Sequence, residues 1–156
     1  ANKGIIAQVM HADGSGWKDL YIPRKLERDL PPGADVSTHR CGLMYMNGRE
    51  VFKFAVGTFQ ELIAQTLEKG GVTVEQVDHF VCHQSNARIL EAARERFGIP
   101  REKLFVNIDR VGNTSAASVP LCLDELRKSG RLREGQVAMF VAFGGGLTWA
   151  SSLWQL

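Results

Sequence analysis

Three short segments of the sequence carry the side chains best suited to chemistry. They are a His-Gln-Ser-Asn segment that begins at His83, a Gly-Asn-Thr-Ser segment that contains Asn113, and a run of three glycines centred on Gly145. A neutral imidazole donates one hydrogen bond, and an asparagine amide also donates. Two neutral donors aimed at one oxygen stabilise an enolate or oxyanion, and the Gly145 N–H could add a third donor. The segments therefore favour a reaction in which negative charge develops on an oxygen.

Each segment also has an ordinary structural interpretation. A histidine at the end of a strand is more often structural than catalytic. Gly-Asn-Thr-Ser is a common helix-capping sequence, and three consecutive glycines commonly form a turn. Taken one at a time, the segments leave both interpretations open.

The three cysteines do not supply a convincing nucleophile. Cys82 precedes His83 on an expected strand, where neighbouring side chains point to opposite faces, so we expect Cys82 in the core. Cys122 lies in a Leu-Cys-Leu segment of an expected helix and is typical of a small buried hydrophobe. Cys41 lies beside a long loop and is the one candidate reactive thiol, but no neighbour in the sequence would activate it.

Basic side chains are concentrated just after His83. One interpretation is a solvated helix face with local ion pairs, and the other is a rim that receives a phosphate or an acidic partner. Lys53 could join such a rim. The basic residues are Arg88, Arg94, Arg96, Arg101 and Lys103, and they alternate with Glu91, Glu95 and Glu102.

The elements that must position these segments alternate between strands and helices. Apolar side chains at intervals of three and four predict a long helix over 49–69, which Gly70 and Gly71 end. Thr73 and Gln76 resemble a capping box, and Ser85 or Asn86 would cap a helix that runs to Phe97. We also expect a long loop over 23–41, a helix over 114–129 in which Pro120 costs a hydrogen bond, and strands over 3–9, 18–22, 78–83, 104–108, 136–143 and 147–155.

This alternation predicts a layered α/β fold. The first two strands could pair with each other, and the last two should be antiparallel. The chemistry-bearing segments follow strands, and ligands commonly bind beyond the carboxyl ends of strands in such sheets. The three segments could therefore converge on one site.

Length and composition indicate a single globular unit over 1–156. The chain has 156 residues, of which 44% are hydrophobic and 23% charged, with a net charge of +2. This charge does not suggest nucleic acid, and no apolar run reaches the roughly 18 residues of a membrane span. Three cysteines without a framework spacing indicate a reducing compartment, so we expect a cytoplasmic protein with no nucleic-acid or membrane partner.

Taken together, the segments resemble the C-terminal half of the β-ketoacyl-acyl carrier protein synthase III family, the condensing enzymes that initiate type II fatty acid synthesis. The resemblance rests on residues 83–89, 112–120 and 142–149, with a further likeness at Gly48–Lys53. It implies a thiolase-like α/β fold, in which this chain is one half of a five-layered αβαβα architecture. The loop at 23–41 is the least family-like part.

The resemblance also implies roles for particular residues. His83 and Asn113 fall on the histidine and asparagine of a Cys-His-Asn triad, and Gly145 falls on a glycine of the oxyanion hole. Three further residues fall along the pantetheine tunnel for coenzyme A, and two on the rim where acyl carrier protein docks. These are Phe52, Asn86 and Ile89 for the tunnel and Lys53 and Arg88 for the rim.

The family's nucleophilic cysteine lies in the N-terminal half, and no cysteine of this chain falls at its position. The resemblance therefore implies a partner half that carries this cysteine, and a homodimer of the whole enzyme. The substrates would be acyl-coenzyme A and malonyl-acyl carrier protein, with no cofactor and no metal. This chain alone would be inactive. The alternatives are a non-catalytic module that binds carrier protein or a synthase subunit, and a related polyketide-initiating condensing enzyme.

Overall fold

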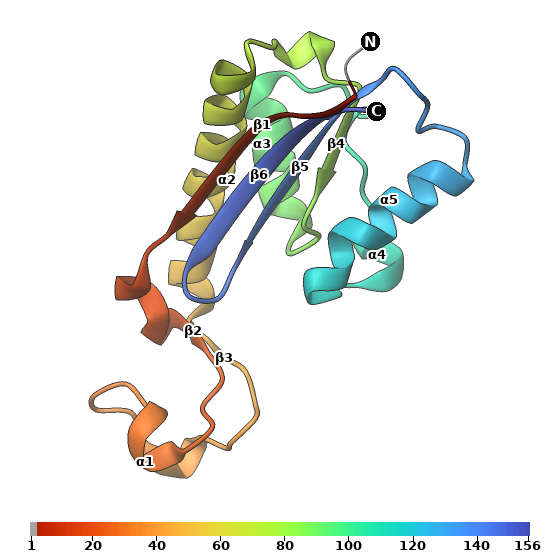
Figure 1. Ribbon diagram of the computed structural model, residues 1–156. Coiled ribbons are helices and arrows are strands. Elements are labelled where there is room, and N and C mark those ends of the chain that lie inside the picture. Colours follow the sequence, from red (N-terminus) through yellow and green to blue (C-terminus); the bar gives the residue numbers. More distant parts are fainter. Residues whose placement is uncertain (1–2) are drawn as a thin grey trace.

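The computed structural model describes residues 3–156, whose main strands form one four-stranded sheet (Figure 1). The strands are β1 (Gly4–Ala12), β4 (His79–Cys82), β5 (Val137–Gly144) and β6 (Thr148–Gln155), in the order β1-β6-β5-β4. β4 and β5 are parallel, whereas β5 and β6, and β1 and β6, are antiparallel. This confirms the expected α/β fold and the antiparallel final pair.

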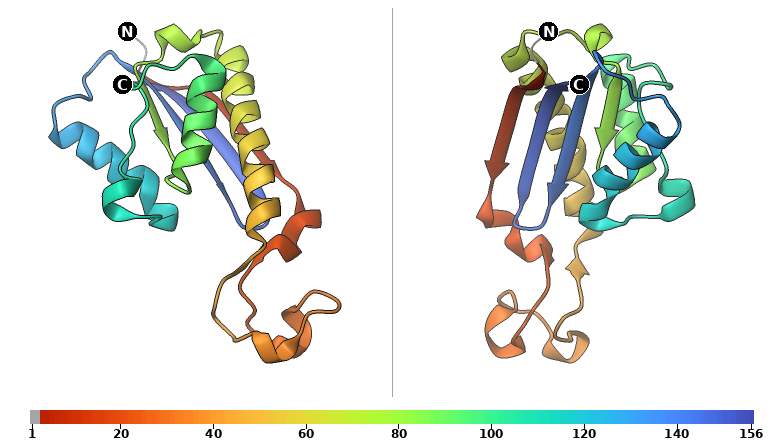
Figure 2. Two further views of the ribbon diagram at one scale, coloured as in Figure 1. Left: turned by 180° about the vertical axis from the view of Figure 1, so that it is seen from behind. Right: turned by 45° about the vertical axis from the view of Figure 1, so that its right-hand side comes forward.

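Two helices cover one face of this sheet (Figure 2). The long helix α2 (Gly48–Gly70) buries Phe59, Leu62 and Ile63 completely against the strands, as its apolar spacing predicts. It ends where Gly71 takes a left-handed conformation. Helix α3 (Ala87–Phe97) packs beside α2 and begins at Asn86, whose side chain accepts a hydrogen bond from the Arg88 N–H.

The opposite face receives helix α5 (Ser118–Lys128), which packs against β4. Strand alternation divides β4 between two cores: Cys82 faces the α2 and α3 side, whereas Val81 faces α5. The expectation that Cys82 points into the core is therefore confirmed. Because α5 begins at Ser118, Pro120 lies in its first turn, where an N–H has no acceptor within the helix, so the expected loss of a hydrogen bond is wrong.

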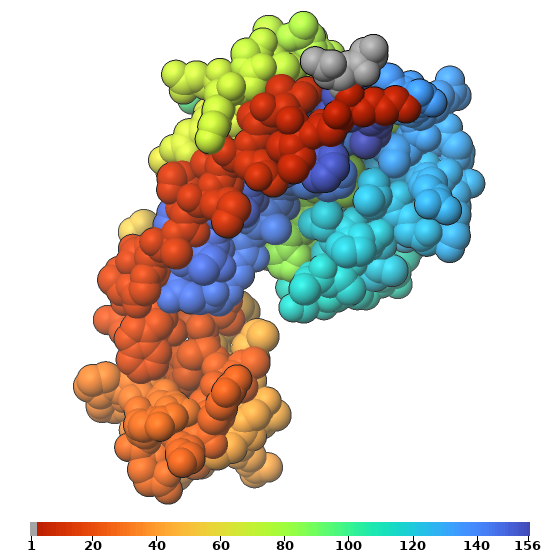
Figure 3. All heavy atoms as spheres, viewed as in Figure 1, coloured from red at the N-terminus to blue at the C-terminus, as the bar shows by residue number. Residues whose placement is uncertain are grey.

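A strand does lie within residues 18–22, but it is short, and its expected pairing with the first strand is wrong. Residues 14–19 form a 3-10 helix, and the two-residue strand β2 (Leu20–Tyr21) pairs with β3 (Tyr45–Met46) instead. We call residues 20–46 the excursion. It is mostly irregular, as expected for 23–41, with the short helix α1 (Leu26–Asp29) and a 3-10 turn over Val36–Thr38. Figures 1 and 3 show that it projects away from the sheet.

The strand expected over 104–108 is reduced to a single parallel bridge between Leu104 and Phe80. The chain then turns into the one-turn helix α4 (Ile108–Val111). The Gln84 side chain takes the place of a strand partner. Its Oε1 accepts the N–H groups of Asn107 and Ile108, so these two N–H groups do not bond to β4. The capping box is present at the 3-10 turn over Val74–Gln76, as predicted.

The sheet face on the side of α5 is uncovered over β1 and β6 (Figure 2). Its exposed side chains include Ile5, at 52% exposure, and Met10, at 74%. Among residues 3–156, no helix combines the length and apolar character that crossing a bilayer requires.

Candidate active site

A cavity of about 1090 Å³ opens where β4 and β5 end and the excursion begins. In Figure 3 the surface is hollowed between the excursion, in orange, and the region of α4 and α5, in cyan. The structure brings six sequence-predicted site residues to this one cavity. They are Phe52, His83, Asn86, Ile89, Asn113 and Gly145.

His83 follows β4 and is held from behind by a hydroxyl pair. Its Nδ1 lies 3.1 Å from Ser118 Oγ, and Thr114 Oγ1 donates to the same Ser118 oxygen at 3.2 Å. When Ser118 Oγ donates to Nδ1, the proton of the neutral ring lies on Nε2, which is then a hydrogen-bond donor. Burial lowers the pKa of His83, which favours this neutral form. The ring centroids of His83 and Phe143 lie 5.5 Å apart in an edge-to-face arrangement.

Asn113 lines the same cavity. Its Oδ1 accepts a hydrogen bond from the Ser115 N–H at 2.9 Å, which occupies the oxygen in a local turn. The Nδ2 group therefore remains as the donor. His83 and Asn113 together offer two neutral N–H donors, the type of pair that stabilises an oxyanion.

The three glycines differ in what their positions require. Gly146 has φ of +137°, and a Cβ there would lie 2.9 Å from Thr148 Cγ2, so only glycine fits. At Gly145 the nearest atom to an added Cβ would be Leu20 O at 3.7 Å, which is ordinary contact. Gly145 is therefore not fixed by sterics, and its N–H has no acceptor within residues 3–156.

The two residues predicted for the docking rim do not line the cavity. Lys53 on α2 and Arg88 on α3 are both exposed, next to the lining residues Phe52 and Ile89. Within the described part of the chain neither forms an ion pair. The neighbouring basic residues differ: Arg94 and Arg101 both pair with Glu91, as the interpretation of local ion pairs predicts.

Sequence reasoning missed several residues of the site. Ser118 and Thr114 orient His83, and their four-residue spacing at a helix start could have indicated a contact. Met44 and Met46 reach the cavity from the excursion, and Met10 reaches it from β1. No periodic pattern in the sequence marks these methionines.

No cysteine is among the described residues that line the cavity. Burial raises the pKa of the Cys82 thiol, and it raises that of Cys122 to about 11. Both thiols are therefore protonated at neutral pH and unsuited to nucleophilic attack. Cys41 is exposed on the excursion. The cavity thus holds donors for an oxyanion without a nucleophile of its own.

Comparison with known proteins agrees with this geometry. Residues 67–156 match the family described as 3-oxoacyl-[acyl-carrier-protein (ACP)] synthase III C terminal. The chain is 48% identical over 143 residues to the β-ketoacyl-[acyl-carrier-protein] synthase III of Deinococcus deserti, covering 92% of this chain and 39% of the relative. It is 43% identical over 150 residues to that of Caldanaerobacter subterraneus, covering 96% of this chain and 45% of the relative.

Solved structures show the same correspondence. The synthase III of Thermus thermophilus superposes with a TM-score of 0.87 at 45% identity, over 99% of this chain and 47% of that one. The synthase III of Aquifex aeolicus gives 0.86 at 39% identity, over 100% and 46%. The chain thus spans somewhat less than half the length of these relatives, and its α/β fold is one half of the thiolase-like architecture. This protein belongs to the 3-oxoacyl-[acyl-carrier-protein] synthase III family and corresponds to its C-terminal half.

Proposed function

We propose that this chain supplies the decarboxylating half of a β-ketoacyl-acyl carrier protein synthase III. A second half would supply the nucleophilic cysteine, and the substrates would be an acyl-coenzyme A and malonyl-acyl carrier protein. The observation that carries the proposal is that His83 and Asn113 line the same cavity, while Nδ1 of the ring contacts Ser118 Oγ and Oδ1 of the amide accepts the Ser115 N–H.

The reaction follows from these two donors. As the malonyl carboxylate leaves as CO2, the electron pair of the broken C–C bond moves onto the thioester oxygen. His83 and Asn113 donate hydrogen bonds to this enolate oxygen, and one such donor is typically worth about 3–4 kcal/mol. The enolate carbon then attacks the acyl carbonyl held on the cysteine, and the cysteine leaves as a thiolate. The Gly145 N–H would stabilise the oxyanion of that tetrahedral intermediate.

The remaining site residues suit the delivery of a thioester arm. Phe52 and Ile89 present apolar surface along the cavity, and the Asn86 oxygen caps α3, which leaves the Asn86 amide hydrogens for the arm. Lys53 and Arg88 are exposed cations without ion-pair partners among the described residues, which suits them to contact an acidic carrier protein. The exposed apolar sheet face suits contact with the cysteine-bearing half.

The test uses the enzyme assembled from this chain and the half that carries the cysteine. His83→Ala and Asn113→Ala should each slow malonyl-thioester decarboxylation by about 100- to 1000-fold. Acyl transfer from coenzyme A to the cysteine should change much less, because it does not need the enolate donors. His79→Gln, at the far end of β4, is the matched control and should leave decarboxylation unchanged. Near-normal decarboxylation in both site variants would overturn the proposal.

A non-catalytic module is the competing function, because the cavity holds no cysteine among the residues described. This chain would then bind acyl carrier protein without a companion half. Binding of carrier protein to the isolated chain, lost in the double variant Lys53→Glu and Arg88→Glu, together with no decarboxylation in the assembled protein, would favour the module over the enzyme.

A further inference from the structure

The loop that carries Asn113 has little structure of its own. We call residues 107–113 the Asn113 loop; its only regular element is the four-residue helix α4. A single helical turn is not stable in isolation, because nucleation fixes several residues for one hydrogen bond. The position of the Asn113 amide must therefore be set by contacts outside the loop.

Gln84 makes the first of these contacts and is completely buried. Its Nε2 donates to Cys82 O and to Phe105 O, both at 3.1 Å. Its Oε1 accepts from the N–H groups of Asn107, at 3.1 Å, and Ile108, at 3.2 Å. These four bonds use the full capacity of a primary amide. One side chain thus joins the end of β4, just before His83, to the start of the Asn113 loop.

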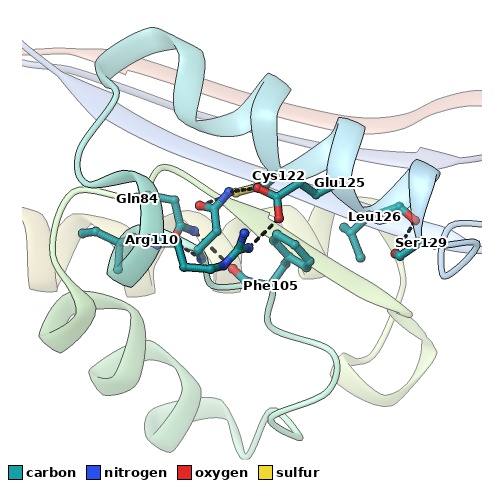
Figure 4. Close-up of polar contacts among 9 residues, drawn as sticks. Gln84, Phe105, Arg110, Cys122, Glu125, Leu126 and Ser129 are labelled. Carbon is teal, nitrogen blue, oxygen red and sulfur yellow. Dashed lines mark hydrogen bonds and ion pairs between the residues drawn. The ribbon is translucent and has the colours of Figure 1, made fainter.

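Glu125 on α5 makes the second contact (Figure 4). One of its oxygens accepts from Asn107 Nδ2 at 2.8 Å, and the other pairs with Arg110 at 2.5 Å. Asn107 is completely buried and also accepts a weak hydrogen bond from Cys122 Sγ at 3.3 Å. Arg110 lies within α4, so the α5 carboxylate holds the loop at two points.

The same helix also orients the histidine. Ser118, at the start of α5, contacts His83 Nδ1, while Glu125, two turns later, holds the Asn113 loop. Gln84 then closes the arrangement by joining the loop to the strand that precedes His83. Both donors are therefore held by one frame, which consists of β4 and α5.

We propose that Gln84 is a positioning residue, assisted by Glu125, that sets the Asn113 amide at the distance from His83 that the enolate oxygen requires. The inference rests on the proposed function and deepens it. Neither residue lines the cavity, so neither touches the substrate. Their contribution acts through the geometry of the loop, and a displacement of about 1 Å in such a geometry costs on the order of 100-fold in rate.

The test compares Gln84→Met with the parent in the assembled enzyme. Methionine keeps the length of the side chain and removes all four hydrogen bonds. We expect the kcat for malonyl decarboxylation to fall by about 10- to 100-fold with little change in KM, and acyl transfer to the cysteine to change little. Amide hydrogen exchange should accelerate at Asn107 and Ile108, whose acceptor is removed, and remain unchanged in α2.

Two further variants separate positioning from general damage. Gln136→Met is the matched control, because Gln136 also accepts a backbone N–H, that of Arg133, but at the far end of β5. It should leave the ratio of decarboxylation to acyl transfer unchanged. Glu125→Gln keeps an acceptor for Asn107 and weakens the contact with Arg110. The ratio of decarboxylation to acyl transfer in this variant should therefore lie between that of the parent and that of Gln84→Met. Glu125→Gln provides the test should Gln84→Met fail to fold.

The outcomes are distinguishable. An equal fall of both activities in Gln84→Met and in Glu125→Gln, or an unchanged ratio with unchanged exchange at Asn107 and Ile108, would overturn the positioning role. Absence of decarboxylation in the parent enzyme would overturn the proposed function instead. In that case the exchange of the two amides still decides whether Gln84 anchors the loop.

Discussion

The Asn113 loop and the excursion both reach the cavity, but they are held in opposite ways. The Asn113 loop is short, and its first residue, the completely buried Asn107, is held by Gln84 and Glu125. The excursion is long and joins the rest of the described chain, which we call the body, through a two-residue strand pair. It stabilises itself with stacked rings, with His39 and Tyr45 at 4.1 Å. It also leaves Met44 61% exposed.

This difference separates two tasks of a site. Groups that must meet a developing charge need a fixed geometry, which buried and fully satisfied hydrogen bonds provide. An apolar wall needs contact area more than a fixed geometry, and exposed methionines adapt to different shapes. We therefore expect substitutions that remove the contacts of the Asn113 loop to alter the stability of the body and its chemistry. Substitutions in the excursion should have only local effects.

The largest effect on stability should come from a substitution in the hydrophobic core between α2 and the sheet. Phe59 is completely buried on α2 and meets Phe143 edge to face at 6.4 Å. Phe59→Ala should lower the free energy of unfolding by about 3–5 kcal/mol, measured by denaturant titration. Leu43→Ala, in the excursion, should change it by less than about 0.5 kcal/mol. Comparable losses of unfolding free energy in the two variants would contradict the expected difference between the body and the excursion.

An intermediate effect is expected beneath the Asn113 loop. Asn107→Ala leaves the Glu125 carboxylate without one of its donors and removes the acceptor of the Cys122 thiol. The free energy of unfolding should fall by about 1–3 kcal/mol, the usual penalty for unpaired buried groups. Asn47→Ala removes only an exposed contact with Asp19 and serves as the control. Equal unfolding midpoints for both variants would show that Asn107 is not a structural anchor.

The sequence predicts the body of this fold well for a physical reason. Burial of α2, β5 and β6 requires apolar side chains at a regular spacing or in a continuous run, and both patterns are visible in the local sequence. The bounds of these elements therefore agree with expectation to within a residue or two. The partner of residues 20–21 is decided by a contact about 25 residues away along the chain, between Leu20 and Met46 among others, and no local pattern records it.

The site shows the same division. His83 and Gly145 follow the parallel strands β4 and β5, so their convergence follows from topology. Asn113 follows the segment expected as a strand over 104–108, which turns into α4 instead. Gln84 ends the expected strand at 104–108 early by accepting two of its N–H groups, and a glutamine in a sequence gives no sign of four buried bonds. The sequence does not predict that Met44 and Met46 reach the cavity, because the excursion has no periodic pattern and is held by stacked rings such as those of His39 and Tyr45.

A smaller effect should be confined to the excursion. Tyr21 OH lies 2.8 Å from His39 Nε2, and Tyr21→Phe removes this hydrogen bond while keeping the ring. The local stability of the excursion should fall by about 1 kcal/mol, because the hydrogen-bonded pair is only half-buried. Limited proteolysis should therefore cut faster between residues 24 and 44, whereas the unfolding midpoint of the body stays the same. A shift of the body's midpoint equal to that of Asn107→Ala would contradict the separation of the two regions.

The smallest effect concerns the charge state of His83. Burial lowers its pKa below the usual 6.5, so between these two values the unfolded chain binds more protons than the folded one. The stability that His83 contributes is therefore complete above pH 6.5 and is lost as the pH falls through the lowered value. We expect the free energy of unfolding to rise with pH in this window, and His83→Asn to flatten that rise. Parallel pH curves for parent and variant would show that the ring is not desolvated, and the frame of β4 and α5 would then hold His83 in open solvent rather than against Phe143.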